Sequence, residues 1–260
     1  MDIIPSRILN PLHIGFDIVF LLGFIILLIV KKRYMTLLFG LAGGVAYFLV
    51  DWGIFYKIMG TREIFFDGAV MGEGGKFWFL MWLSMSYGIT NFAWIWLWLR
   101  RDKHLKEFSL YILIGWLSVA VAATGLGGEL SQISISRGTG IFHAVMAIYL
   151  VLAYGAVIVF NLFNKKGKKL PLMWMLAIGI LVQLGWEVAL LLGGVRSPGF
   201  SPYEAIQTLV INSLIETNPA VPSILLFQYL LYKWRGEDLK KPAQGTMLEG
   251  TNQIPSTGLS

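Results

Sequence analysis

Long apolar stretches alternate with short polar connections along most of the 260-residue chain. A helix needs about 20 predominantly apolar residues to cross the hydrocarbon core of a bilayer. Seven stretches are long enough, at residues 12–30, 36–56, 77–99, 108–126, 139–160, 171–193 and 206–232. The short segments of alternating polarity that build a membrane β-barrel are not evident. The pattern predicts an all-α, polytopic membrane protein, a bundle of seven transmembrane helices.

The composition favours a membrane protein over a soluble one, because 56% of the residues are hydrophobic and only 14% are charged. The chain has no cysteine, which excludes disulfides, thiolate metal ligands and cysteine nucleophiles. Its three histidines lack the spacing of metal-binding motifs, and no glycine-rich nucleotide motif follows a strand pattern. The sequence therefore predicts neither a metal nor another cofactor.

Basic residues are distributed unequally between the two sides of the predicted bundle. Fifteen of the 21 Lys and Arg residues follow the odd-numbered spans: Lys31, Lys32, Arg33, Arg100, Arg101, Lys103, Lys106, Lys165, Lys166, Lys168, Lys169, Lys233, Arg235, Lys240 and Lys241. The other six are Arg7, Lys57, Arg62, Lys76, Arg137 and Arg196. The positive-inside rule then places the N-terminus outside and the C-terminus in the cytoplasm. This asymmetry explains the net charge of +6 without a nucleic-acid partner.

The chain divides into one membrane domain and a tail. Residues 1–235 contain all seven spans, whereas residues 236–260 are rich in Gly, Pro, Ser, Thr and Asn and have no apolar period. Such a composition predicts a mobile cytoplasmic tail. No basic cluster precedes the first span, so we expect no cleavable signal. We expect a multi-pass protein of the cell membrane or an endomembrane, in contact with membrane lipid, and the sequence does not set its oligomeric state.

Four carboxylates lie within the predicted spans, where an ionisable group is costly and usually marks function. They are Asp17, Asp51, Glu187 and Glu216. Asp51, Glu187 and Glu216 all fall in the outer halves of their spans, and we take them as catalytic candidates. Polar pairs four residues apart share a helical face: Tyr87 with Asn91, Gln183 with Glu187, and Asn212 with Glu216. The sequence predicts an acidic pocket in the outer half of the bilayer, to which these polar partners contribute substrate-binding side chains.

Two tryptophans are adjacent to these carboxylates in sequence, Trp52 beside Asp51 and Trp186 beside Glu187. An aromatic wall near an acid can stabilise a cation or bind an apolar ligand, so both are further substrate-binding candidates. Asp51 has a second interpretation, because Arg62 across the following loop would pair with it.

Other polar residues of the spans have simpler interpretations. His13 and Asp17 lie near the outer interface, where water would solvate them, and His143 is typical of a packing residue. Glu216 is followed by Pro219 and Pro222, which predict a helix kink at the carboxylate.

Trp186-Glu187 and the Asn-Ser-Leu-Ile-Glu-Thr-Asn stretch of residues 212–218 resemble the seven-span terpene cyclases of fungal meroterpenoid and indole-diterpene pathways, the pyripyropene and paxilline type. The resemblance implies that one membrane carboxylate protonates an epoxide or olefin of a lipophilic substrate while a second acid assists. It assigns Asp51 as the first acid and Glu216 as the second, with Glu187 beside them. Burial disfavours a charged carboxylate, so such an acid can be kept neutral as a proton donor.

Two other classes of function fit the same residues. Asp51-Trp52 followed by Gly60-Thr61-Arg62 parallels Trp186-Glu187 followed by Gly194-Val195-Arg196, which suggests two three-span repeats joined by a linking fourth span. Such repeats and buried carboxylates are typical of proton-coupled transporters of small molecules. In a non-catalytic membrane interaction protein, the carboxylates would be interhelical hydrogen-bonding partners. The ligand is open among isoprenoids, other lipids and small polar solutes.

Overall fold

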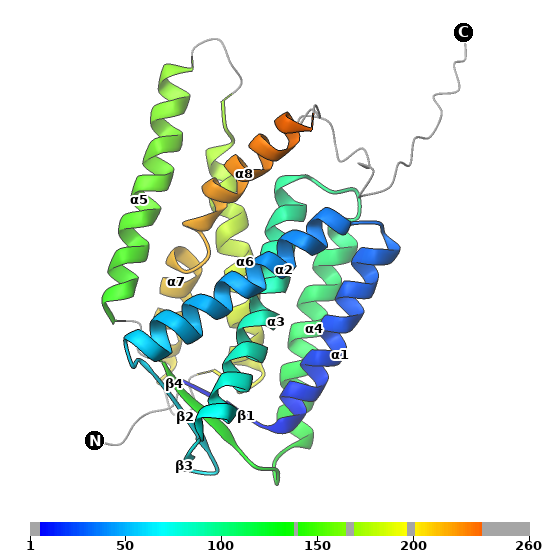
Figure 1. The fold of residues 1–260 in the computed structure, drawn as a ribbon, viewed down its shortest axis with the longest axis vertical. Coiled ribbons are helices and arrows are strands. Elements are labelled where there is room, and N and C mark those ends of the chain that lie inside the picture. Colours follow the sequence, from blue (N-terminus) through cyan, green and yellow to red (C-terminus); the bar gives the residue numbers. More distant parts are fainter. Residues whose placement is uncertain (1–5, 138–139, 165–168, 197–200, 236–260) are drawn as a thin grey trace.

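The computed structural model describes residues 6–137, 140–164, 169–196 and 201–235, and these residues form a mainly helical bundle (Figure 1). The helices are α1 (Pro11–Val30), α2 (Tyr34–Phe48), α3 (Glu73–Leu99), α4 (Leu105–Leu126), α5 (Gly140–Phe163), α6 (Leu172–Leu192), α7 (Pro202–Ile215) and α8 (Ala220–Trp234). A π-helical segment, η1 (Leu49–Ile58), continues α2 without a break. The predicted cytoplasmic tail, residues 236–260, lies outside the described residues.

Six helices of the described chain are long and apolar enough to cross a membrane: α1, α2 with η1, α4, α5 from Phe142, α6, and α7 with α8. The one remaining predicted span, the third at residues 77–99, corresponds to α3, which is long enough at 27 residues. Its sequence contains five Trp together with Ser, Tyr, Thr and Asn, which lower its mean hydropathy. Because α3 packs at the centre of the bundle and most of its second half is buried, its polar side chains face other helices. The count of seven spans stays a prediction.

The all-α prediction is wrong at one end of the bundle, where a four-stranded antiparallel sheet closes the helices (Figure 1). Its strands are β1 (Arg7–Leu9), β2 (Arg62–Phe66), β3 (Ala69–Val70) and β4 (Ile133–Arg137), in the order β1-β4-β2-β3. Strands of two to five residues are too short to stand out in a hydropathy pattern. Two local signals were present: the Ile-Ser-Ile-Ser alternation of β4, and Asp67-Gly68 with positive φ in the β2–β3 hairpin. We call this end of the bundle the sheet end.

The strand register brings four arginines to the sheet end. Arg62 of β2 is directly opposite Arg137 of β4. Arg7 of β1 forms an isolated bridge with Arg196, which follows α6. The backbone of the next residue, Ile8, also donates to the Val195 carbonyl at 3.0 Å, so the segment after α6 is held to the edge of the sheet.

The opposite end of the bundle is tied together by a different ion pair. Arg33, between α1 and α2, contacts Asp102, between α3 and α4, and both side chains are buried. Asp102 also accepts a hydrogen bond from the backbone of His104 at 2.8 Å. The pair links the α1–α2 connection to the α3–α4 connection, 69 residues later in the chain. This ion pair therefore holds the two connections together at this end of the bundle.

Small residues set the distance between α2 and α3. Gly40 and Gly44 of α2 face Ile89 and Gly88 of α3, and the backbones approach closely. A Cβ atom placed on Gly88 would lie 2.6 Å from the Cα atom of Gly44. Only glycine therefore allows this approach.

The last apolar stretch is broken at the predicted place. Helix α7 ends at Ile215 and α8 begins at Ala220, with Pro219 before it and Pro222 in its first turn. Proline is tolerated there because the first amides of a helix have no intrahelical acceptor. Glu216, Thr217 and Asn218 lie in the break between the two helices, and the kink predicted at Glu216 is confirmed.

We predict that Gly88→Ala lowers the stability of the purified protein by about 1–3 kcal/mol, the usual cost of overpacking, because α2 and α3 would have to separate. A thermal unfolding scan in detergent checks it. The matched control is Gly15→Ala on α1, where a Cβ atom meets nothing within 4 Å. A Gly88→Ala midpoint as high as that of the control would contradict the packing argument.

Candidate functional site

Asp51 is a buried, ion-paired carboxylate. Arg62 Nε donates to its Oδ1 atom at 2.7 Å, and Ser84 Oγ donates to Oδ2 at 3.2 Å. Arg137 Nη2 lies 3.6 Å from Oδ1. Burial and the neighbouring Arg137 lower the pKa of Arg62 to about 10, so Arg62 still carries its charge at pH 7. The predicted pairing of Asp51 with Arg62 is confirmed, and a neutral general acid at Asp51, which the resemblance implies, does not fit this geometry.

Glu187 on α6 is held in the same way. Arg196 Nε lies 3.1 Å from Glu187 Oε2. The other carboxylate oxygen, Oε1, accepts from Asn212 Nδ2 at 3.1 Å and from Gln183 Nε2 at 3.3 Å. The predicted polar partners Gln183 and Asn212 thus hold the acid itself.

Glu216 differs from the other two acids. Its side chain is only partly buried, and Gln183 Nε2 donates to its Oε2 atom at 2.7 Å. No ion pair of Glu216 is found within the described residues, although Arg196, Arg137 and Arg7 are its electrostatic neighbours. Its position in the helix break, and not in a regular helix, places the carboxylate next to α6.

Gln183 is the centre of the site because it uses every hydrogen-bonding capacity of its amide. Its Nε2 group donates to both Glu187 and Glu216, and its Oε1 atom accepts from the hydroxyls of Tyr87 and Thr217. These partners come from α3, from α6 itself and from the α7–α8 break. The network fixes the amide orientation and joins α3, α6 and the α7–α8 break at one point.

The acid and arginine pairs form a repeated arrangement in the two halves of the chain. In each half an acid near the sheet end of an apolar helix is paired with an arginine beyond that helix, Asp51 with Arg62 and Glu187 with Arg196. In each half the next helix adds a polar group, Ser84 of α3 or Asn212 of α7. The parallel seen in the sequence is thus present in the contacts.

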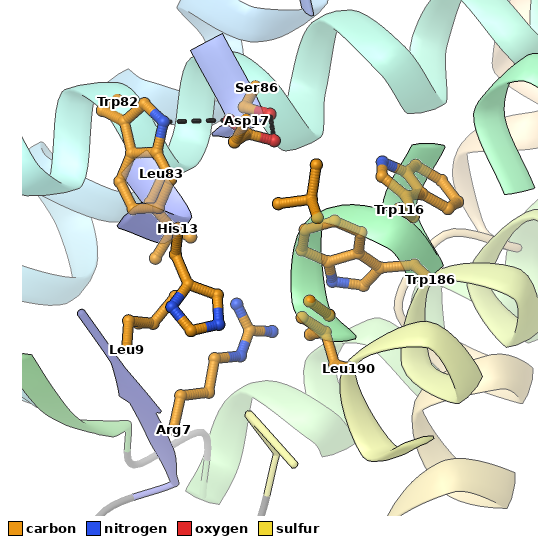
Figure 2. Close-up of a pocket in the computed structure, with 12 residues that line it drawn as sticks. Arg7, Leu9, His13, Asp17, Trp82, Leu83, Ser86, Trp116, Trp186 and Leu190 are labelled. Atoms are coloured by element: carbon orange, nitrogen blue, oxygen red, sulfur yellow. Dashed lines mark hydrogen bonds between the residues drawn. The ribbon is translucent and has the colours of Figure 1, made fainter. Parts of the chain in front are cut away.

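A chain of aromatic rings runs from this network to a cavity. Tyr47 and Tyr87 have ring centroids 4.7 Å apart, Tyr87 and Trp186 5.3 Å, and Trp186 and Trp116 5.0 Å. Trp186 and Trp116 form one wall of the cavity, whose volume is about 30 Å³ (Figure 2). That space accommodates about one or two water molecules. In this closed arrangement the cavity does not accommodate an isoprenoid chain.

His13 and Asp17 line this cavity, and the interpretation of both as water-exposed interfacial residues is wrong. Asp17 Oδ2 accepts from Trp82 Nε1 at 2.9 Å, and Oδ1 accepts from Ser86 Oγ at 2.9 Å. His13 is anchored by Asn10, which caps α1. Both residues are buried because α1 packs against α3 and α4, although they lie close to the end of their helix.

Two predicted binding residues lie away from the acids. Trp52 stacks on Tyr56 and packs edge-on against Phe77, with Lys57 over its face. Neighbours in a helix project to different faces, so Trp52 is directed away from the carboxylate beside it. Asn91 is buried one turn along α3 from Tyr87, and its amide has no hydrogen-bonding partner within the described residues.

The site predicted from the sequence did not include three arginines that the structure places near the acids. Arg7, Arg137 and Arg196 all act on the acid network. In the sequence Arg7 and Arg137 counted only toward orientation, and Arg196 counted toward orientation and the repeat. A signal was present, because four of the six basic residues predicted outside are Arg, whereas most of the others are Lys. Arginine is the residue favoured for buried ion pairs. In the described part of the chain no cluster of His, Asp and Glu could hold a metal ion.

Comparisons of the chain with protein-family models, with curated proteins and with solved structures find no match. The similarity to the terpene cyclases therefore stays a prediction drawn from the residues of α6 and α7.

We predict that Arg196→Gln destabilises the protein by about 3–5 kcal/mol, the usual cost of leaving one partner of a buried ion pair unpaired. The double variant Glu187→Gln/Arg196→Gln should recover most of this loss, as measured by thermal unfolding. Glu73→Gln removes one partner of the exposed Lys57–Glu73 pair and serves as the control with little effect. A double variant no more stable than Arg196→Gln would show that the pair is not coupled.

Proposed function

We propose that this chain is a multi-pass membrane enzyme that protonates a lipophilic substrate, of the terpene-cyclase class that it resembles, with Glu216 as the proton donor. The contrast among the three acids carries the proposal. Asp51 and Glu187 are each bound to an arginine, whereas Glu216 is partly accessible and bonded to an amide. A general acid must reach its substrate and must not be held as an anion by a contacting cation.

The proposal also includes the orientation of the bundle in the membrane. Arg33, Arg100 and Arg101 lie at the end of the bundle opposite the sheet, and the positive-inside rule assigns such an end to the cytoplasm. The sheet end, with the acids, would then face the outside.

The surroundings of Glu216 support proton donation. Gln183 bridges Glu216 and Glu187 through one amide nitrogen, so the two carboxylates are close enough to repel each other. A proton on Glu216 removes that repulsion, because the remaining charge on Glu187 is paired with Arg196. Gln183 thus favours an arrangement with one acid and one carboxylate.

The reaction follows from this arrangement. Glu216 would give its proton to an alkene carbon or an epoxide oxygen, and the resulting carbocation would be attacked by a second double bond of the same chain. Loss of a proton from a carbon of the cyclic cation to the Glu216 carboxylate restores the acid and gives a neutral product of unchanged composition, so the reaction is an isomerisation. The rings of Tyr47 and Tyr87, both electrostatic neighbours of Glu216, offer π faces to the cation.

We predict that Glu216→Gln abolishes cyclisation while leaving substrate binding largely unchanged. The protein in lipid nanodiscs is incubated with isoprenoids of different chain length, with and without a terminal epoxide, and isomers of unchanged mass are separated by chromatography. General acid catalysis contributes about 10²–10⁴-fold, which sets the expected loss. The exposed Glu129→Gln is the matched control.

Two results would overturn the proposed cyclase. One is full turnover by Glu216→Gln, and the other is no conversion of any of these substrates by a wild-type protein that is folded and monodisperse.

A second function, a proton-coupled transporter, is favoured by the repeated acid–arginine arrangement. Two halves, each with an ion pair and a polar contact from the next helix, would be the two repeats of such a transporter, with the α7–α8 break at the site. Here Glu216 would load and release a proton as a solute crosses.

For a transporter we predict that Glu216→Gln removes the pH dependence of solute exchange in proteoliposomes, because the titrating group is gone. The assay loads the vesicles with a mixture of labelled small solutes and compares release at pH 6 and pH 8. Equal pH dependence in Glu216→Gln and in the Glu129→Gln control would exclude this role.

A further inference from the structure

A groove runs along the outside of the bundle between α1 and α4, which pack side by side at its edge (Figure 1). Its volume is about 650 Å³. It extends from Phe16 to Leu27 along α1 and from Ala122 to Glu107 along α4. At 1.5 Å per helical residue the length along α1 is about 16 Å, half of a hydrocarbon core that is about 30 Å thick. The groove is therefore about as long as one acyl chain of a bilayer lipid.

The floor of the groove is apolar and rigid. Phe20 and Tyr111 both line it, and their stacked rings have centroids 5.5 Å apart. Each ring lies against a glycine of the other helix. A Cβ atom on Gly115 would be 2.3 Å from the Phe20 ring, and one on Gly23 would be 2.1 Å from the Tyr111 hydroxyl. That hydroxyl also donates to the Phe20 carbonyl at 3.0 Å. The hollow is thus formed by the two helices before any ligand binds.

Basic side chains gather where the groove ends, on the side of the bundle opposite the sheet. Both acids in residues 100–107 are already paired, Glu107 with Lys31 at 2.9 Å and Asp102 with Arg33. The Lys31–Glu107 pair joins the end of α1 to the start of α4, and Glu107 itself lines the groove. Three further lysines of these connections are exposed: Lys32, Lys103 and Lys106. This end of the groove therefore carries an excess of positive charge.

The charge distribution favours a lipid over a second copy of the chain. Two copies paired along this face by a two-fold axis would bring their lysines together at the same end, where like charges repel. A lipid with an anionic headgroup places its phosphate at the lysines and its acyl chain along the apolar floor. One ligand then matches both the charge and the length of the groove.

We propose that the groove between α1 and α4 binds one anionic phospholipid. An acyl chain lies over Phe20 and Tyr111, and the phosphate contacts Lys32, Lys103 and Lys106. The volume is in the range of small-ligand sites, and basic pockets between membrane helices recognise anionic headgroups on the cytoplasmic side. The proposal rests on membrane insertion of the bundle but not on the chemistry of Glu216, so failure of a cyclase or transporter assay leaves it unchanged.

Native mass spectrometry of the delipidated full-length protein tests the headgroup contact. The protein in detergent is titrated with phosphatidylglycerol or with phosphatidylcholine of the same acyl chains. We expect one phosphatidylglycerol to bind in preference to phosphatidylcholine. Lys32→Gln/Lys106→Gln should weaken phosphatidylglycerol binding roughly 20-fold, because each basic residue near an anionic headgroup contributes about fivefold. Lys233→Gln, at the end of α8 and away from the groove, is the matched control and should bind as the wild type does.

A groove-filling variant tests the acyl-chain contact with every lysine in place. Ser118 lines the groove, so Ser118→Phe should weaken the binding of both lipids. Ile148→Phe on the exposed face of α5 is its control. A thermal scan without lipid checks folding, and Ala122→Leu replaces Ser118→Phe if that variant unfolds. Equal affinity of the wild type for the two lipids, no effect of filling the groove, or a dimer that the filling variant dissociates would each overturn the proposal.

Discussion

The structure of the sheet end depends on one constraint, that a carboxylate buried in an apolar bundle must find a cation or several donors. Asp51, Glu187 and Asp17 are each nearly excluded from solvent, and each has a different set of partners. Asp51 contacts arginines and a hydroxyl, and Glu187 contacts an arginine and two amides. Asp17 accepts hydrogen bonds from an indole and a hydroxyl. Such pairs contribute little net stability, but losing one partner is expensive. The sheet meets this requirement, because its strands carry Arg7, Arg62 and Arg137 to the helix ends.

The same requirement explains why the helix break is ordered. Glu216, Thr217 and Asn218 are consecutive residues between the two helices, where the Glu216 amide makes the last hydrogen bond of α7, to the Asn212 carbonyl at 3.0 Å. The side chain of each is fixed by another helix. The first two are bonded to Gln183 of α6, and Asn218 accepts from Tyr154 of α5 at 2.7 Å. Gly179 of α6 leaves room for Asn218, since a Cβ atom there would lie 2.3 Å from Asn218 Oδ1. A break that would be costly alone is thus held by three contacts.

The sequence was sufficient for features that depend on composition over many residues or on strong local chemistry. The apolar runs located the helices, Pro219 and Pro222 located the break, and the proximity of Asp51 and Arg62 was foreseen from their separation in the chain. It was not sufficient for the sheet, because strands of two to five residues carry almost no periodicity. The pairing joins β4 to β1, more than 100 residues earlier, and to β2, about 70 residues earlier. The role of Arg137 depends on that pairing, so it could not be read from neighbouring residues.

The composition of α3 has a consequence for how the chain is made. Its polar and aromatic residues pair with other helices in the finished bundle, but those partners include Gln183, which is synthesised about 100 residues later. Taken alone, α3 would partition poorly into a bilayer. In the proposed membrane setting it would enter beside α2, whose glycine-lined face it covers, so that the two form a helical hairpin at the translocon. The glycines that allow this close contact would then contribute to biogenesis as well as to the stability of the folded protein.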